Sequence, residues 1–261
     1  MITNGGLAGM LLCVLICFGI PIGGFVILNK REHKMTKAFL LGAATFFIFQ
    51  IVLRIPILSY VLPNQTWYII LSSHKVAYSL FLGITAALFE EIGRFIVIKY
   101  ALKRWRESDG IAFGLGHGGI EAILLVGINY FLFLISTLLL RFGSSDLVKQ
   151  VFGDLLSAQL VTIINTTSSA TILVAGLERF LTMIIHIGMT MLVFHGLKKG
   201  KAVLYLLIAI LVHTILDSAV GILPLLGIGM AGIELFIFVI ASILLVYTVV
   251  SVKHNKDEQT I

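Results

Sequence analysis

Seven long apolar segments constrain this chain more strongly than any other feature of its sequence. A helix needs roughly 20 mostly apolar residues to cross about 30 Å of hydrocarbon. Only 12% of the 261 residues are charged and 59% are hydrophobic, whereas soluble domains are about a quarter charged. We therefore predict an all-α, polytopic membrane protein with one integral membrane domain over residues 1–261. Its seven transmembrane helices are expected at about 7–28, 38–62, 77–101, 111–140, 172–196, 202–223 and 231–251.

The basic residues predict the orientation of these helices. By the positive-inside rule, loops rich in Lys and Arg face the cytoplasm, so we expect the N-terminus outside and the C-terminus inside. The same placement explains the net charge of +6 without a nucleic-acid partner. The opposite loops contain only Lys75, Arg141 and Lys149. The predicted cytoplasmic loops contain Lys30, Arg31, Lys34, Lys37, Lys99, Lys103, Arg104, Arg106, Lys198, Lys199 and Lys201.

One predicted external loop, residues 144–164, has apolar residues at helical spacing. This pattern is typical of an amphipathic helix lying on the membrane interface. Such a helix is either a packed connector or a gate for lateral entry into the helix bundle, and the sequence leaves both open. The apolar residues of this segment are Val148, Val151, Phe152, Leu155, Leu156 and Leu160.

Ionisable side chains interrupt four of the apolar segments. Charges inside a membrane cost several kcal/mol when they face lipid, so they usually face the bundle interior and mark function. Three pairs have i, i+4 spacing, which places both members on one helix face. The third segment contains Glu90, Glu91 and Arg94, and the other three contribute His117, Glu121, His186, His213 and Asp217.

The depth of these side chains supports a shared site. At 1.5 Å of rise per residue, four of them lie roughly 15 Å from the predicted cytoplasmic ends of their helices. These four are Glu90, Glu121, His186 and His213, one from each of spans three to six. We therefore expect spans three to six to form the active core.

Other polar side chains of the spans are not assigned to this site. Arg54 lies near the outer end of the second span, where we expect it to snorkel to the surface or to pair with Glu178 or Asp217. Cys13 and Cys17 are one helical turn apart in the first span and are interpreted as small apolar fillers.

The clustered residue types favour hydrolysis inside the membrane. A buried carboxylate beside another carboxylate can exchange protons near neutral pH and act as a general base. Histidines that point to the same place can stabilise a developing oxyanion. No Gly-rich phosphate loop, G-x-S-x-G elbow or H-E-x-x-H motif occurs. Proton or cation transport is the alternative, and a non-catalytic membrane scaffold is a third.

Four motifs resemble those of a known protease family. In chain order they are "EEIGR", "GLGHGGIEA", "ERF" with a later His, and "HTILD". This series resembles the YhfC-like family of glutamic-type intramembrane proteases, which is related to the PrsW and CAAX-prenyl or bacteriocin-processing membrane proteases. The resemblance covers nearly the whole chain. It implies a multi-pass protein of the bacterial cell membrane that cleaves a membrane-protein or lipid-anchored peptide substrate.

The resemblance also implies a role for each clustered residue. Glu90 would activate the hydrolytic water, with Glu91 and Arg94 supporting it. His186 would lie beside that water. In this mechanism no cofactor is required. The remaining residues would bind the oxyanion or water, or complete the site: His213, Asp217, His117 and Glu121.

A zinc-dependent version of this site is the main mechanistic alternative. Two histidines, one carboxylate and a water are a known catalytic zinc arrangement, and a separate Glu serves as base. His186, His213 and Glu121 would be the ligands and Glu90 the base. The metal-free version is our expectation, and oligomeric state is not predicted.

Overall fold

The fold is entirely helical over the residues that the computed structural model describes, which are 3–31, 35–102 and 106–257. This confirms the predicted all-α class. Lys34, Lys103 and Arg104, which contributed to the predicted orientation, lie outside the described residues. The orientation of the termini therefore stays a prediction.

Within the described residues, seven helices are long and apolar enough to cross a membrane, as predicted, but one member of the set differs. The helix α8 (Ser145–Thr166), expected on the interface, meets the criterion of length and composition. The helix α5 (Lys75–Ala101), which carries the charged "EEIGR" motif, is not among the seven although it has 27 residues. The other six correspond to predicted spans.

Packing divides the chain into two compact units. The first contains residues 1–23 and 121–180, and the second contains residues 24–120 and 181–261. The predicted single membrane domain stays a prediction.

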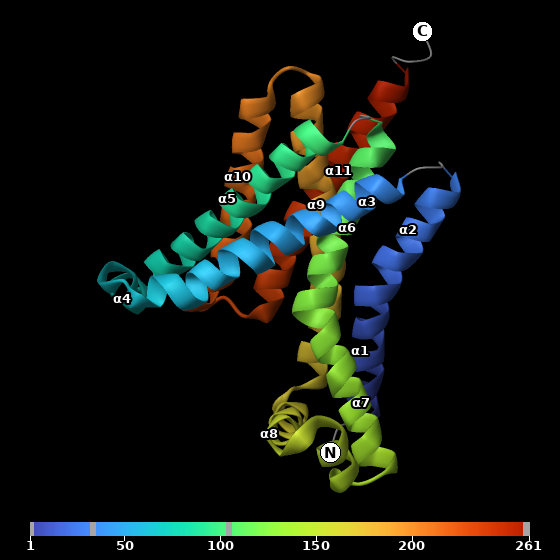
Figure 1. Ribbon diagram of the computed structural model, residues 1–261, viewed down its shortest axis with the longest axis vertical. Coiled ribbons are helices and arrows are strands. Elements are labelled where there is room, and N and C mark those ends of the chain that lie inside the picture. The colour runs from blue at the N-terminus through green and yellow to red at the C-terminus, as the bar shows by residue number, and fades with distance from the viewer. Residues whose placement is uncertain (1–2, 32–34, 103–105, 258–261) are drawn as a thin grey trace. The chain divides into compact units, whose positions relative to one another are not determined.

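The first unit is built from α1 (Asn4–Val14), the π-helical turns η1 (Leu15–Gly19) and η5 (Ala122–Gly127), α7 (Ile128–Phe142), α8 and the first part of α9 (Ser169–Lys198). In Figure 1, α1 and α7 run side by side, and they pack against each other. The core of this unit is formed by Met10, Leu160, Ile164 and Ile172.

The helix α8 is bent at Gly153, whose φ of 75° lies in the left-handed region. Gly adopts such angles without the steric cost of a Cβ. The bend divides the predicted apolar face: Val148 and Leu160 are buried, whereas Val151 and Leu155 are exposed. The segment is therefore two short helical pieces and not one continuous amphipathic surface.

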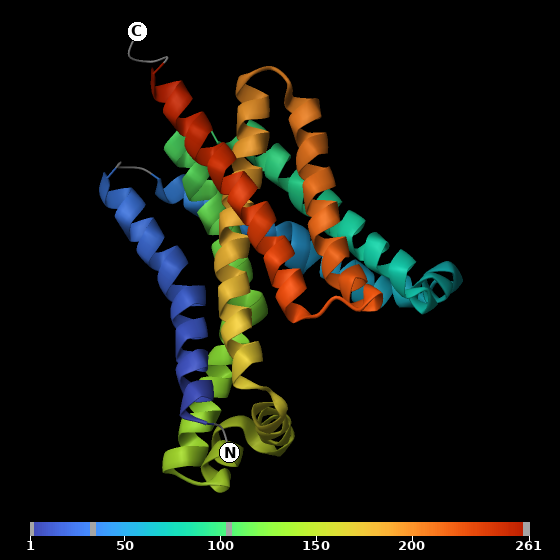
Figure 2. The same ribbon diagram turned by 180° about the vertical axis from the view of Figure 1, so that it is seen from behind.

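The second unit contains the remaining helices and the charged motifs. Its chief elements are α3 (Thr36–Phe46) with its π-helical extension η2 (Phe47–Arg54), α5, α6 (Glu107–Glu121), the second part of α9, α10 (Ala202–Ile222) and α11 (Met230–Asp257). In both views α5 and α10 lie side by side (Figures 1 and 2). The shorter elements are η3 (Ile57–Val61), η4 (Leu62–Asn64), α4 (Thr66–Ser73) and η6 (Leu223–Leu226), and α2 (Ile20–Arg31) begins in the first unit and ends in the second.

Glycines allow α6 to touch the backbones of two neighbouring helices. A Cβ on Gly116 would lie 2.0 Å from the carbonyl oxygen of Phe39 in α3, and a Cβ on Gly114 would lie 2.5 Å from the Cα of Ile187 in α9. No side chain fits such gaps. The "GLGHGG" sequence therefore holds α6 between α3 and α9, with His117 at the centre of the packed region.

A polar contact ties the first turn of α6 to the end of α9. The Glu107 carboxylate lies 2.7 Å from His195 Nε2 and accepts a hydrogen bond of 2.6 Å from Lys198 Nζ. His195 Nδ1 in turn lies 2.9 Å from the Tyr247 hydroxyl of α11. This network fixes the lengthwise position of α6 against α9.

Candidate active site

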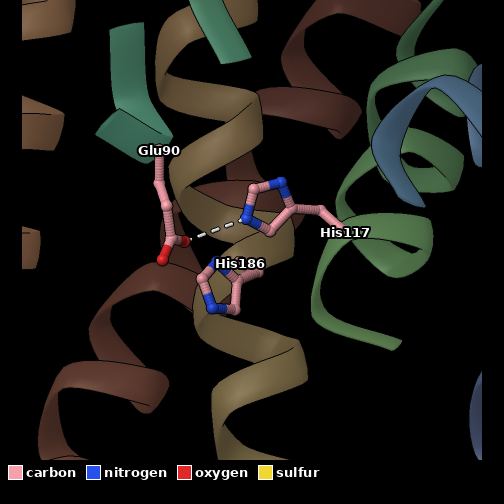
Figure 3. Close-up of side chains that lie close together, drawn as sticks. All are labelled: Glu90, His117 and His186. Atoms are coloured by element: carbon pink, nitrogen blue, oxygen red, sulfur yellow. Dashed lines mark hydrogen bonds and ion pairs between the residues drawn. The ribbon is translucent and has the colours of Figure 1, made fainter. Parts of the chain in front are cut away.

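Three side chains from three helices of the second unit point toward one another at its centre. Figure 3 shows Glu90 from α5, His117 from α6 and His186 from α9. One donor atom of each lies within 4.8 Å of the others, and His117 Nε2 is 3.0 Å from Glu90 Oε2. Their exposed fractions are 4%, 0% and 5%. The fold thus assembles a dry group of one carboxylate and two imidazoles.

A second group of charges lies directly beside it. The Glu91 Oε1 atom accepts a hydrogen bond from Arg94 Nη1, one turn along α5, and lies 2.8 Å from His213 Nδ1 of α10. Glu91 and Arg94 are completely buried. The charge on one is thereby compensated by the other, which is the condition under which buried ions are stable.

His213 connects the two groups. Its Nε2 atom lies 4.0 Å from Glu90 Oε2 and 3.6 Å from Asp217 Oδ2. The Asp217 side chain is 35% exposed, so it forms the open edge of an otherwise dry site. Spans three to six therefore meet here, with residues from α5, α6, α9 and α10.

Seven of the eight predicted site residues lie in this cluster, and Glu121 does not. In the first unit, Glu121 Oε1 accepts a hydrogen bond of 2.9 Å from Arg179 Nη1. Arg179 is also paired with its neighbour Glu178. His117, four residues earlier in the same helix as Glu121, supplies the side chain of α6 that reaches the cluster.

The predicted helix start explains why Glu121 was placed at the wrong depth. Helix α6 begins at Glu107, four residues before the predicted boundary at 111. Counted from the true start, His117 is 10 residues into its helix, close to the 11 residues that separate Glu90 from the end of α5. The depth argument thus identifies His117 once the boundary is corrected.

The environment of Arg54 also differs from expectation. It donates from Nε to Thr85 Oγ1 (3.2 Å) and from Nη2 to the Leu82 carbonyl (2.7 Å), both on α5. It neither snorkels nor pairs with a carboxylate among the described residues, and its exposed fraction is 8%.

The donor set of the central group suits a metal ion. Two imidazoles with one carboxylate are ligands typical of catalytic zinc, and such sites keep a further position for water or substrate. The donors are close together and buried, and His117 Nδ1 has no hydrogen-bond partner among the described residues, so this ring is held by its Nε2 side alone.

One contact must change for a metal to bind. His186 Nδ1 lies 3.0 Å from Arg94 Nη2, and because a guanidinium has no acceptor, the imidazole uses its lone pair in this bond. A neutral imidazole has one lone pair. His186 therefore ligates a metal only after releasing Arg94, which keeps its ion pair with Glu91.

Comparison with known proteins identifies the family of the chain. The family model described as "YhfC intramembrane metalloprotease" matches residues 16–226. The chain belongs to this family. It is also 30% identical over 259 residues to a protein described as "Uncharacterized membrane protein YhfC" from Bacillus subtilis (strain 168). The aligned residues make up 97% of this chain and 98% of that protein. No solved structure matches the chain.

Membership of the YhfC family changes the balance between the two predicted mechanisms. The family description supports the predicted intramembrane protease and favours the metal-dependent alternative over the metal-free glutamic one. A relationship to the PrsW and CAAX proteases does not follow from these matches. The expected ligand set also changes, because the structure groups Glu90 and His117 with His186, whereas His213 contacts Glu91.

Proposed function

We propose that this chain is a metal-dependent intramembrane endopeptidase in which Glu90, His117 and His186 hold the metal ion. The observation that carries the proposal is the convergence of these three buried donors from three helices. The substrate is a membrane-embedded or lipid-anchored peptide, because His117 and His186 lie on helical segments that are long and apolar enough to cross a membrane. The bound metal would supply Lewis acidity, which activates water and polarises a carbonyl oxygen.

His213 is the residue best placed to move the proton of the attacking water. When its Nδ1–H donates to Glu91, the lone pair of Nε2 is left facing Glu90 and Asp217. An imidazole in this state accepts a proton and later returns it to the leaving amine, as a general base and then a general acid. We assign this role to His213.

Glu91 and Arg94 act through His213. The carboxylate that accepts from Nδ1–H fixes the tautomer and orientation of the ring and stabilises the imidazolium that forms. Arg94 holds this carboxylate ionised and in place by its own hydrogen bond. Asp217, on the far side of the ring, adds a second negative charge near Nε2. We therefore describe Glu91 and Arg94 as positioning residues.

Metal content and cleavage test the proposal together. We expect purified protein to contain about one metal ion per chain, detected by elemental analysis, and to lose peptide cleavage on treatment with a membrane-permeant chelator. Readdition of Zn²⁺ should restore activity. Mass spectrometry of membrane peptides from cells with wild-type protein or Glu90→Gln would identify the substrate.

The metal-free mechanism makes the opposite prediction. There, the short contact between Glu90 and His117 would be a hydrogen-bonded pair that activates water unaided. Full cleavage activity in protein without metal would select this mechanism, and ion flux that depends on Glu90 without any cleavage would select transport.

A further inference from the structure

Two buried polar side chains of the second unit have no role in the proposed chemistry. Gln50 and Arg54 both lie in η2, and each has an exposed fraction of 8%. The other two arginines of the spans are neutralised, since Arg94 pairs with Glu91 and the partly buried Arg179 pairs with two carboxylates. Among the described residues, Arg54 has no carboxylate within ion-pair distance. A buried charge whose hydrogen bonds all go to neutral groups is costly, so this arginine requires an explanation.

The hydrogen bonds of Arg54 use only part of its capacity. Its Nε and one Nη2 proton are bonded to Thr85 and Leu82 of α5. A guanidinium has five N–H donors, and Nη1 makes no hydrogen bond to the described residues. The Nη1 donors are therefore available to an acceptor that is not part of the described chain.

Gln50 has an unused hydrogen-bond acceptor, which complements the unused donors of Arg54. Its Oε1 atom is buried without a hydrogen-bond partner among the described residues. Residues four apart on a helix lie on the same face, so Gln50 and Arg54 present an unused acceptor and unused donors to the same side of η2. An unsatisfied buried acceptor costs about 1–3 kcal/mol, which a ligand with an N–H group would recover.

These two side chains lie on the helix that contacts the candidate metal centre. One turn before Gln50, the Phe46 ring lies 5.5 Å from the His117 ring. Gly93 of α5 faces the Phe49 ring, and Arg54 lies further back along α5, beside Thr85. The helix formed by α3 and η2 thus runs from the proposed metal ligand His117 along α5.

Asp217 lies along the same stretch of α5. Helices α5 and α10 are antiparallel, because His213 contacts Glu91 while Ser218 faces Gly83. Asp217, one residue before Ser218, is therefore near the level of Arg54's contacts on α5. A carboxylate so close disfavours an anionic ligand for Arg54 and favours a neutral, dipolar one.

A peptide main chain has the required chemistry. Each peptide unit offers one N–H and one C=O, which match the acceptor of Gln50 and the donors of Arg54. A peptide bond that is to be hydrolysed must leave its helix, and the lipid offers no partner for the main-chain groups that are freed. We propose that Gln50 and Arg54 form a subsite that binds the main-chain amide groups of an unwound substrate segment next to the scissile bond. This inference rests on the proposed protease function.

Binding of two synthetic transmembrane peptides tests the subsite. One is an uninterrupted Leu/Ala helix of about 20 residues, and the other has Gly-Pro at its centre, which opens the helix. Metal-loaded protein in nanodiscs is titrated with each dye-labelled peptide, and binding is followed by energy transfer. We expect the Gln50→Leu, Arg54→Met double variant to bind the Gly-Pro peptide at least tenfold more weakly than wild type, with no more than a twofold change for the uninterrupted peptide.

Thr45→Val is the matched control. Thr45 is as deeply buried on the same helix, but its hydroxyl already bonds to the Leu41 carbonyl at 2.7 Å, so this variant should bind both peptides like wild type. Arg54→Lys, which keeps a donor and the charge, should lose less affinity than Arg54→Met. Metal content and melting temperature are measured for each variant to establish that it is folded.

The possible outcomes separate this inference from the proposed function. Equal affinity of a folded double variant and wild type for the Gly-Pro peptide overturns the subsite, even if cleavage is found. Equal losses for both peptides also overturn it, because they indicate a general packing defect. Binding that depends on Gln50 and Arg54, without any cleavage, supports the subsite and refutes the proposed protease function.

Discussion

A partly buried arginine in the first compact unit and a buried one in the second show how similar charges have different roles. Arg179 in the first unit is bonded to two carboxylates, Glu121 and Glu178. Arg94 in the second unit is bonded to one carboxylate, Glu91, and to the imidazole of His186. The carboxylates around Arg179 accept hydrogen bonds from the arginine itself. Arg94 and its partner Glu91 instead contact histidines, which exchange protons and bind metals near neutral pH.

An ionisable residue inside a span is therefore not sufficient evidence of catalytic chemistry. Both arginines lie in the chain's apolar helices beside glutamates, and by charge alone Glu121 is as good a candidate as Glu90. The decisive feature is the presence of imidazoles around Glu90, with His117 3.0 Å from its carboxylate.

The first prediction contrasts His117 with Glu121 on the same continuous helical stretch. His117→Ala should remove bound metal and lower cleavage by about a thousandfold or more, as expected when a metal catalyst is lost. Glu121→Gln should retain one metal per chain and at least half of the wild-type activity per folded molecule. Elemental analysis and peptide cleavage assays measure both. Metal loss in Glu121→Gln with full loading of His117→Ala would reverse the assignment.

The second prediction concerns Arg94. Arg94→Met should lower the turnover rate by about a hundredfold, because Glu91 loses the donor that holds it against His213, and positioned acid–base groups contribute typically 10²–10⁴-fold. Metal content should remain at the wild-type level, since His186 no longer shares its lone pair with the guanidinium. Loss of metal together with activity would show that Arg94 supports the ligands and not His213.

The third prediction concerns the Arg179 network. Arg179→Met removes the guanidinium that is bonded to Glu121. Breaking a fully buried ion pair costs about 3–5 kcal/mol, and the cost here is smaller because the two side chains are 11% and 12% exposed. We expect a lower melting temperature of the detergent-solubilised protein, with cleavage per folded molecule within twofold of wild type. Glu178→Gln should have a smaller effect on melting, because the Glu178 side chain is 31% exposed. Normal stability with abolished cleavage would give Arg179 a functional role after all.

Much of the helical architecture could be predicted from the sequence, because apolar length is a direct requirement of the bilayer. Helix α10, for example, was expected at 202–223 and spans Ala202–Ile222. The i, i+4 pairs also correctly placed His213 and Asp217 on one face. The bend at Gly153 was missed, since glycine occurs within straight helices as well, and only the tertiary structure determines its φ.

The partners of each charge could not be predicted in the same way. Contacts such as Glu91 with His213 join residues 122 positions apart, and a sequence pattern gives only the face of a helix, not its neighbour. A four-residue error at the start of α6 was enough to exchange Glu121 for His117. The missing signal was local: Glu107 and Asp109 supply acidic residues to the first turn, a common feature at helix N-termini.

The backbone contacts of α6 have a consequence for how the enzyme responds to its membrane. Helices usually adapt to bilayers of different thickness by tilting. Between Gly116 and Phe39 on one side and Gly114 and Ile187 on the other, no side chain acts as a compressible spacer. Tilting of α6 against α3 or α9 is therefore blocked by direct backbone collision. The separation of His117 from His186 should therefore stay constant when acyl chain length varies.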